Sequence, residues 1–354
     1  MLLIDWPCAR IYRFSAGLAR LSRKCCRREE RPACEEGWSR IRSEREFLVG
    51  FCGGRDQVVF IRPMTIVSCK GFSELSAAER GAILSLLDDD DPAVERLLVD
   101  RLVSFGRPAL EWLLPLLPSA SPVMRHRVGA VKTRIDRDQF ESEFLSFCVG
   151  SEDEMDLEDG LWRFVLVEYP AISLKGYCAL IDSFAEVLSE RLSGRTSGEA
   201  VFAIVNQYLF EELNFSGNEN EYYDPENSFL NRVIDRRTGI PITLSALLLL
   251  IAQRLDLPVV GIGMPGHFLC RYQTSREEFY IDAFNRGRLL KKSECIQFLK
   301  ETSFGYRSEY LHPASPRAIL LRVCQNLWQI HSQNEDLQAA ERVQRYVTAL
   351  SRRR

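Results

Sequence analysis

Hydrophobic positions recur at two different spacings along the chain, and the change between them divides the sequence. From residue 161 to residue 254, apolar residues return every three or four positions, which is the spacing of α-helices. The segments that follow, "PVVGIGM", "HFLCRYQ" and "EEFYIDAF", are short, β-branched and aromatic, and are bounded by turn residues. We therefore predict a small antiparallel sheet packed on the long helix "PITLSALLLLIAQR", which is an α+β fold.

Short helices are expected on both sides of this core. Before it, "SELSAAERGAILSLL", "DDDDPAVERLLVDRLVSFG", "RPALEWLLPLL" and "SPVMRHRVGAVKTRI" resemble about two degenerate HEAT-type repeats. Asp91 is expected to cap one of these helices, with Pro92 at its first position and Gly106 at its end. After the core, "SPRAILLRVCQNLWQIHSQNEDLQAAERVQRYVTAL" predicts two amphipathic helices around a polar turn, which resemble a single tetratricopeptide hairpin.

Changes of composition place the domain boundaries. We predict an extension over residues 1–65, a HEAT-like region over 66–150, the α+β core over 151–312 and the helical hairpin over 313–354. The extension is basic on balance and has little hydrophobic periodicity. It is interpreted either as an arm that touches RNA or a partner, or as a disordered extension or an over-called start with Met64 as the true first residue. The second interpretation is favoured because the stretch has little hydrophobic periodicity, as is common for a chain terminus.

Bulk properties exclude several classes of protein. The chain has 354 residues and a formal net charge of −3, which gives no general argument for nucleic acid or an acidic membrane surface. The longest apolar run, "ALLLLIA", is far shorter than the roughly 18 residues of a membrane span. The N-terminal "MLLIDWPCAR" also lacks the unbroken apolar core of a signal peptide. We expect a cytoplasmic protein.

Neither the cysteines nor the glycines form a recognisable cofactor motif. The eleven cysteines contain no CxxC pair and no accompanying His-x₃₋₅-His, so neither a zinc site nor any other metal or cofactor is expected. The segment "GIGMPG" formally matches GxGxxG. A dinucleotide site needs a helix after that turn, whereas here Pro265 and a predicted strand follow. Gly266 is instead expected to allow a tight turn between two strands.

One histidine has a candidate partner. His267, in "PGHFL", is predicted at the start of a strand, and Asp282, in "YIDAF", lies on the next strand. Neighbouring antiparallel strands can place a carboxylate beside an imidazole, select one tautomer and stabilise the imidazolium. A lone histidine on an apolar strand is usually structural, so Asp282 is what makes His267 a candidate functional residue.

The segment "YYDPENSFLNRVIDRRTGIPITLSALLLLIAQRLDLPVVGIGMPGHFLCRY", followed by "FYIDAFNRGRLL", resembles the bacterial SirB family in its transglutaminase-like members. The resemblance covers roughly residues 159–309, and a tetratricopeptide-like tail is also typical of that family. It implies a papain-like transglutaminase core with a catalytic cysteine, histidine and aspartate. Gly239 then precedes the nucleophile position, His267 and Asp282 fall on the other triad positions, and Pro241 falls where the cysteine should be.

Two other side chains could replace the missing thiol. Cys270 follows His267 by three positions on one strand, so alternation directs it to the opposite face and into the core. Ser245 lies one helical turn after Pro241 on the same face and is the candidate substitute nucleophile. That role requires its Oγ within hydrogen-bond reach of a ring nitrogen of His267. Otherwise Ser245 is a helix serine bonded to a preceding carbonyl.

The resemblance also suggests which residues line a cleft. Asp224 and Asn227, in "NEYYDPENS", are candidates together with Gly239, Pro241 and Gly266. The favoured alternative is that this loop caps the following helix "FLNRVID", with Asn227 or Ser228 as the N-cap.

These observations predict a degenerate transglutaminase-like protein without catalytic activity. It would bind a protein or peptide partner through the vestigial cleft and the helical flanks. The alternative is a hydrolase or acyltransferase, peptidase-like, that uses His267 and Asp282 with Ser245 or a water molecule. A weaker third interpretation is a regulatory protein that acts through the basic N-terminal arm.

Overall fold

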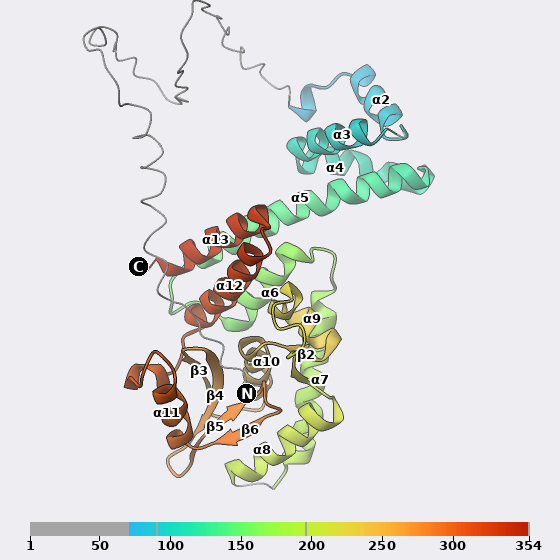
Figure 1. The fold of residues 1–354 in the computed structure, drawn as a ribbon. Helices are drawn as coiled ribbons and strands as arrows, with labels where there is room; N and C mark the ends of the chain where they lie inside the picture. Colours follow the sequence, from blue (N-terminus) through green and yellow to red (C-terminus); the bar gives the residue numbers. More distant parts are fainter. Residues whose placement is uncertain (1–70, 90, 195–196, 353–354) are drawn as a thin grey trace, which may run out of the picture. The chain divides into compact units, whose positions relative to one another are not determined.

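The structure is a computed structural model that describes residues 71–89, 91–194 and 197–352 (Figure 1). The chain divides into two units, Met1–Lys70 and Gly71–Arg354, and only the second is described. The predictions for residues 1–65 therefore lie outside the described residues. Within the described part, no helix is long and apolar enough to cross a membrane.

The N-terminal part of the described chain is helical. Its elements are η1 (Phe72–Glu74), α2 (Ala77–Leu86), α3 (Pro92–Phe105), α4 (Arg107–Leu113), η2 (Leu114–Ser119) and α5 (Pro122–Cys148). The predicted boundaries of α3 are confirmed. Asp91 accepts a hydrogen bond from the backbone N–H of Ala93 at 2.8 Å, Pro92 is the first helical residue, and Gly106 ends the helix with φ 67°. Helix α5 is one continuous helix of 27 residues. Its first half packs among these helices, and its last turns belong to the main core.

Most helices of the main core precede its sheet in the sequence. They are α6 (Leu157–Glu168), α7 (Leu174–Leu192), α8 (Gly198–Asn206), the π-helical η3 (Gln207–Glu212), η4 (Pro225–Ser228), α9 (Leu230–Arg236) and α10 (Pro241–Arg254). Helix α6 ends just before Tyr169 and Pro170, and α7 begins after them. Helix α10 is buried from Pro241 through Ala252 because it is apolar on every side. It contacts α7, α9, α12 and the strands β3 and β4 (Figure 1).

The main sheet is antiparallel, with strand order β3-β4-β5-β6. Its strands are β3 (Val259–Met264), β4 (His267–Gln273), β5 (Glu278–Asp282) and β6 (Arg288–Leu290). Phe268 and Cys270 belong to the same core as α10, whereas Leu269 and Tyr280 belong to a smaller core with α11 (Lys292–Glu301). Both faces of the sheet are therefore covered, which explains why the strands are almost continuously apolar.

The predicted α+β fold is confirmed, and three of its strands lie where the sequence placed them. Four elements were missed: β6, α11, and the parallel two-residue strands β1 (Ser216–Gly217) and β2 (Thr238–Gly239). The turn between β3 and β4 has two residues, and Gly266 in it has φ 77°. The expectation that Gly266 serves a tight turn, rather than a dinucleotide site, is therefore confirmed.

The chain ends in the helices α12 (Pro316–Gln333) and α13 (Leu337–Ser351), which pack against each other. Helix α12 also contacts α6 and α10, and α13 contacts α5. The buried Arg317, at the start of α12, connects that helix to the C-terminal ends of α5 and α13. Its guanidinium donates to the carbonyl oxygens of Cys148 at 2.8 Å, Gly150 at 2.6 Å and Leu350 at 3.3 Å. These carbonyls lie where α5 and α13 end, so intrahelical donors are missing there.

Replacing Arg317 with methionine is expected to lower the free energy of unfolding by about 2–4 kcal/mol, because buried carbonyl oxygens lose a charged donor. Urea denaturation followed by circular dichroism measures this loss. Arg134→Met is the matched control, since Arg134 is half exposed and pairs with Asp100 at the surface. The control should change the free energy by no more than about 1 kcal/mol. Equal effects of the two substitutions would contradict the role assigned to Arg317.

Candidate functional site

The start of α10 is tied to the loop before α9. Ile240 is the N-cap residue and Pro241 is the first residue of the helix, where the absent N–H of proline breaks no hydrogen bond. Thr243 Oγ1 accepts from the backbone N–H of Ile240 at 3.2 Å and donates to the carbonyl oxygen of Asn227 at 2.8 Å. Gly239 lies in β2, immediately before this turn. The helix start is thus rigid and buried, and position 241 carries no ionisable group.

His267 and Asp282 meet, as their strand positions suggested. His267 Nε2 lies 2.8 Å from Asp282 Oδ2. The same carboxylate accepts from Asn285 twice: from the side-chain amide at 2.8 Å and from the backbone N–H at 3.2 Å. Asp282 is only 4% exposed. An ionised Asp282 acts as acceptor for the Nε2–H of His267, so the ring presents its Nδ1 away from the pair.

Opposing effects act on the pKa of Asp282. Burial raises it, whereas the hydrogen bonds and charge of His267 and the two hydrogen bonds from Asn285 lower it, and the net shift is downward. Asp282 is therefore ionised at neutral pH and holds the imidazole in one orientation.

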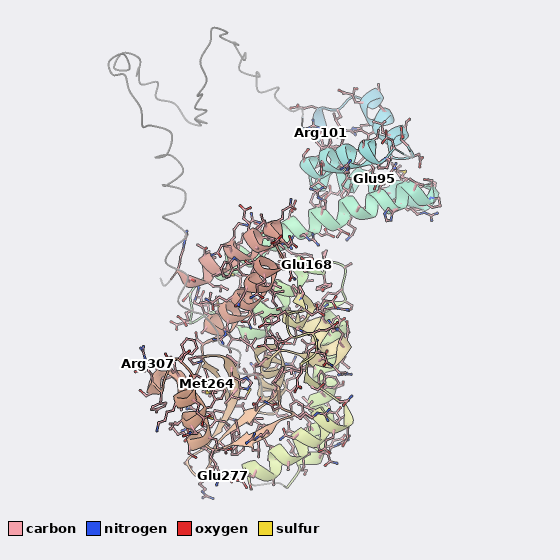
Figure 2. The ribbon with its side chains drawn as sticks, in the orientation of Figure 1. Glu95, Arg101, Glu168, Met264, Glu277 and Arg307 are labelled. Carbon is pink, nitrogen blue, oxygen red and sulfur yellow. The ribbon has the colours of Figure 1, made fainter. Side chains whose placement is uncertain are left out.

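Aromatic rings surround His267. Phe284 lies edge-on to it, with ring centroids 6.4 Å apart, and Phe298 of α11 lies 6.2 Å away. Phe284 also contacts Tyr222. Two rings of this neighbourhood are accessible, since Phe298 is 40% exposed and Tyr223, which packs on Tyr222, is 46% exposed. We call Tyr222, Tyr223, Phe284 and Phe298 the aromatic rim. Met264, labelled in Figure 2, pairs with His267 across the hairpin beside it.

Ser245 and Cys270 lie between α10 and the sheet. Ser245 is fully buried, and its hydroxyl donates to the carbonyl oxygen of Phe268 at 3.5 Å. Cys270 Sγ lies 3.6 Å from the carbonyl oxygen of Ser245. Within the described residues, no hydrogen bond joins Ser245 to His267, so the geometry required of a substitute nucleophile is not met. The expectation that Cys270 is a core residue is confirmed.

The thiols of the described residues are not activated. The free cysteines there are Cys148, Cys178, Cys270, Cys295 and Cys324. Burial raises the pKa of every one of them, to about 12 for Cys270 and Cys295. Because the thiolate is the reactive form, a raised pKa lowers the reactivity of these side chains at neutral pH.

Asp224 and Asn227 hold the loop before α9 in shape. Asp224 caps η4 by accepting from the backbone N–H of Glu226 at 3.0 Å, and it forms an ion pair with Arg236 at 2.6 Å. The amide of Asn227 donates to the carbonyl oxygen of Glu221 at 2.7 Å.

The predicted N-cap of the next helix was wrong. Helix α9 begins after Phe229, without a side-chain cap, because the preceding residues already form η4.

A polar pocket of about 470 Å³ lies close to the His267–Asp282 pair. It is lined by Ser216, Gly217, Asn218, Glu219, Asn220, Thr238, Phe284, Asn285 and Arg286. None of the five predicted cleft residues lines it. The sequence analysis missed this pocket because its walls come from three separate segments. The clustering of Asn and Gly in "NFSGNEN" and "FNRGR" was the available signal.

Comparison with known proteins defines the class of fold. A profile of the transglutaminase-like superfamily matches residues 175–325, which include α10, the main sheet and most of α12. The chain is also 36% identical over 152 residues to human F-box only protein 21, covering 35% of this chain and 24% of that protein. No solved structure matches the chain.

Bacterial relatives define the family. A UPF0162 protein of Pseudomonas aeruginosa is 30% identical over 210 residues, which are 56% of this chain and 74% of that protein. A UPF0162 protein of Xylella fastidiosa (strain Temecula1) is 35% identical over 181 residues, which are 49% of this chain and 64% of the relative. The chain therefore belongs to the UPF0162 family, and it spans somewhat less than two thirds of the Xylella relative.

Asp282→Asn is expected to lower the free energy of unfolding at pH 7 by about 1–3 kcal/mol, because charge-assisted hydrogen bonds to a buried carboxylate are lost. A carboxylate whose pKa is lowered on folding contributes stability above its unfolded pKa, near 3.9. That contribution disappears as pH falls through the lower folded pKa. The difference between the two proteins should hold from pH 7 to pH 5 and shrink below about pH 4.

Urea unfolding across this pH range measures the difference. Glu294→Gln is the control, because Glu294 is exposed and, among the described residues, pairs with exposed Arg288 and with the start of its own helix. A destabilisation by Asp282→Asn that does not depend on pH would contradict an ionised Asp282.

Proposed function

We propose that this protein binds a peptide segment of a partner protein at the surface around His267, without thiol chemistry. The observation that carries the proposal is Pro241 at the first position of α10, the position at which the transglutaminase pattern would have its cysteine. The His267–Asp282 hydrogen bond that such a cysteine would use is nevertheless kept at 2.8 Å. A retained histidine–aspartate pair without the nucleophile fits a site used for recognition.

The aromatic rim supports a binding role. Aromatic side chains are enriched at protein interfaces, and a few of them often contribute most of the binding energy. Phe298 and Tyr223 are accessible rings on different elements, and His267 lies beside Phe298. Because Asp282 holds Nε2, His267 can offer Nδ1 to a backbone amide or, when protonated, to a carbonyl group of the partner.

A second candidate function is hydrolysis through a water molecule. The intact His267–Asp282 hydrogen bond favours it, since an oriented imidazole can act as a general base. Ser245 is a poorer candidate than water, because its hydroxyl is directed to Phe268 in the interior.

The degenerate-site interpretation predicts the behaviour of a thiol restored by Pro241→Cys. At the first turn of a helix, free N–H groups and the helix dipole stabilise an anion. A neighbouring imidazolium would add to this, so the thiol pKa should fall below about 8.5 by one unit or more. Alkylation by iodoacetamide at pH 7 should then be fast, and adding His267→Ala should slow it several-fold.

Thr238→Cys provides the matched control, because Thr238 lies three residues earlier in β2 and is only partly buried. Its alkylation should not depend on His267. If the thiol introduced at position 241 titrates like a free cysteine and ignores His267, the two positions do not meet. The alignment behind the proposal would then fail.

Binding itself is tested by selecting peptides from a random display library on the intact protein. The selected peptides should bind at least 10-fold more weakly to Phe298→Ala and to His267→Ala, since each removes part of the contact surface. Leu97→Ala is the control, because Leu97 is 73% exposed on α3, outside this surface. Equal binding to all variants would refute the proposed surface. Ester or amide hydrolysis that His267→Ala abolishes would refute the non-catalytic assignment.

A further inference from the structure

The turn between β5 and β6 holds an arginine in an unusual backbone conformation. Arg286 has φ 54° and Gly287 has φ 71°, so two consecutive residues are left-handed. Such a conformation is uncommon for a long side chain and is retained where surrounding contacts impose it. Here Asn206 donates to the carbonyl oxygen of Gly287 at 2.6 Å, and the N–H of Gly287 donates to the carbonyl oxygen of Asp282 at 2.8 Å. The turn therefore presents Arg286 from a rigid base.

Arg286 is available to a ligand. Its residue is exposed and lines the polar pocket. Within the described part of the chain, its guanidinium takes part in no ion pair or hydrogen bond. By contrast, Arg288, two residues later, pairs with Glu294 at 3.2 Å. A guanidinium offers a planar set of N–H donors that matches the two oxygens of a carboxylate.

The other pocket walls suit a small, polar, singly charged group. They include three asparagines and the hydroxyl residues Ser216 and Thr238, while Glu219 is the acid among the lining residues. The amide nitrogens of Asn218 and Asn285 each donate one hydrogen bond within the protein, to Asn227 and Asp282, and each keeps a second N–H. The formal charges of Arg286 and Glu219 cancel, so the pocket does not attract polyanions by net charge. The volume of about 470 Å³ is in the range of small-ligand pockets.

Two pocket residues connect the pocket to the His267 site. Asn285 lines the pocket and donates its side-chain amide to Asp282 at 2.8 Å. Phe284 also lines the pocket, and its ring contacts His267. The ring of Phe284 also packs on Gly217 of the pocket wall. The contact is so close that a Cβ on residue 217 would collide with the ring. A peptide lying on the aromatic rim can therefore reach the pocket with its next residues.

We infer that this pocket is a carboxylate subsite, in which Arg286 pairs with an acidic side chain or the C-terminal carboxylate of the bound peptide. The amides of the pocket supply the remaining hydrogen bonds. This inference rests on the proposed function, because it assigns the chemistry of the peptide that the His267 surface binds. It adds a charge requirement that the aromatic rim alone does not impose.

Three short peptides test the subsite on the intact protein. The first is acetyl-Phe-Gly-Glu-Gly-amide, which has an acidic side chain. The second is acetyl-Phe-Gly-Gln-Gly with a free C-terminal carboxylate, and the third is the same neutral sequence with a C-terminal amide. Titrations are followed by the backbone amide NMR signals of pocket residues 216–220 and 284–287 and of His267 and Phe298. The pocket signals report the subsite. At least one of the two carboxylate peptides should shift these signals with an affinity at least 5-fold above that of the neutral peptide. The peptide that does so identifies the source of the carboxylate.

Charge variants give opposite expected changes. Arg286→Gln should weaken carboxylate binding at least 5-fold, whereas Glu219→Gln should strengthen it about 2-fold or more by removing a repelling charge. Arg276→Gln is the matched control, since Arg276 is equally exposed but lies on the turn between β4 and β5, outside the pocket. It should leave the affinity unchanged. Equal affinity for the neutral peptide, or weaker binding by Glu219→Gln, would overturn the inference.

The NMR signals also separate this inference from the proposed function. Shifts confined to His267 and Phe298, with none at the pocket, would refute the carboxylate subsite and leave the peptide-binding surface intact. The absence of shifts at both places up to millimolar peptide would refute both.

Discussion

The burial of α10 is the constraint on which the rest of the core depends. A helix that is apolar on every side cannot remain in contact with water, because each exposed Leu or Ile would forgo about 1.5–3 kcal/mol of burial energy. Strands β3 and β4 cover one side of α10, and α7, α9 and α12 contact it elsewhere. The C-terminal hairpin is thus part of the covering of this helix, and Arg317 holds that hairpin to the end of α5.

This burial restricts where chemistry can occur. Side chains in the middle of α10, such as Ser245, face packed neighbours and satisfy their hydrogen bonds with interior carbonyls. The first turn of the helix contacts the polar loop before α9, through Thr243 and Asn227, and that turn begins with Pro241. Interior packing therefore accounts for the absence of an activated thiol or hydroxyl in this core, since burial raises the thiol pKa values there.

The polar groups that remain ordered lie where the sheet ends. Asp282 is the last residue of β5, and it holds His267 on one side and Asn285 on the other. The following turn continues from Asn285 into Arg286 and the pocket. One buried carboxylate thus fixes the orientation of the imidazole and the position of the turn, so the aromatic rim and the polar pocket form adjoining parts of one surface.

The sequence by itself determined the features that depend on local pattern. Helical spacing predicted α3, α10 and the C-terminal helices, and short β-branched and aromatic segments between turn residues predicted β3, β4 and β5. The placement of His267 and Asp282 on adjacent strands predicted that they would meet. Strands β1 and β2 were missed because two residues carry no periodicity, and their pairing joins segments about twenty residues apart. The predicted N-cap of α9 was wrong because the residues that would have capped it belong to η4. Only the tertiary structure decided that Ser245 faces Phe268, that Asn285 supports Asp282 and that Arg286 reaches a pocket. Each of these depends on contacts between distant segments, which no local spacing encodes.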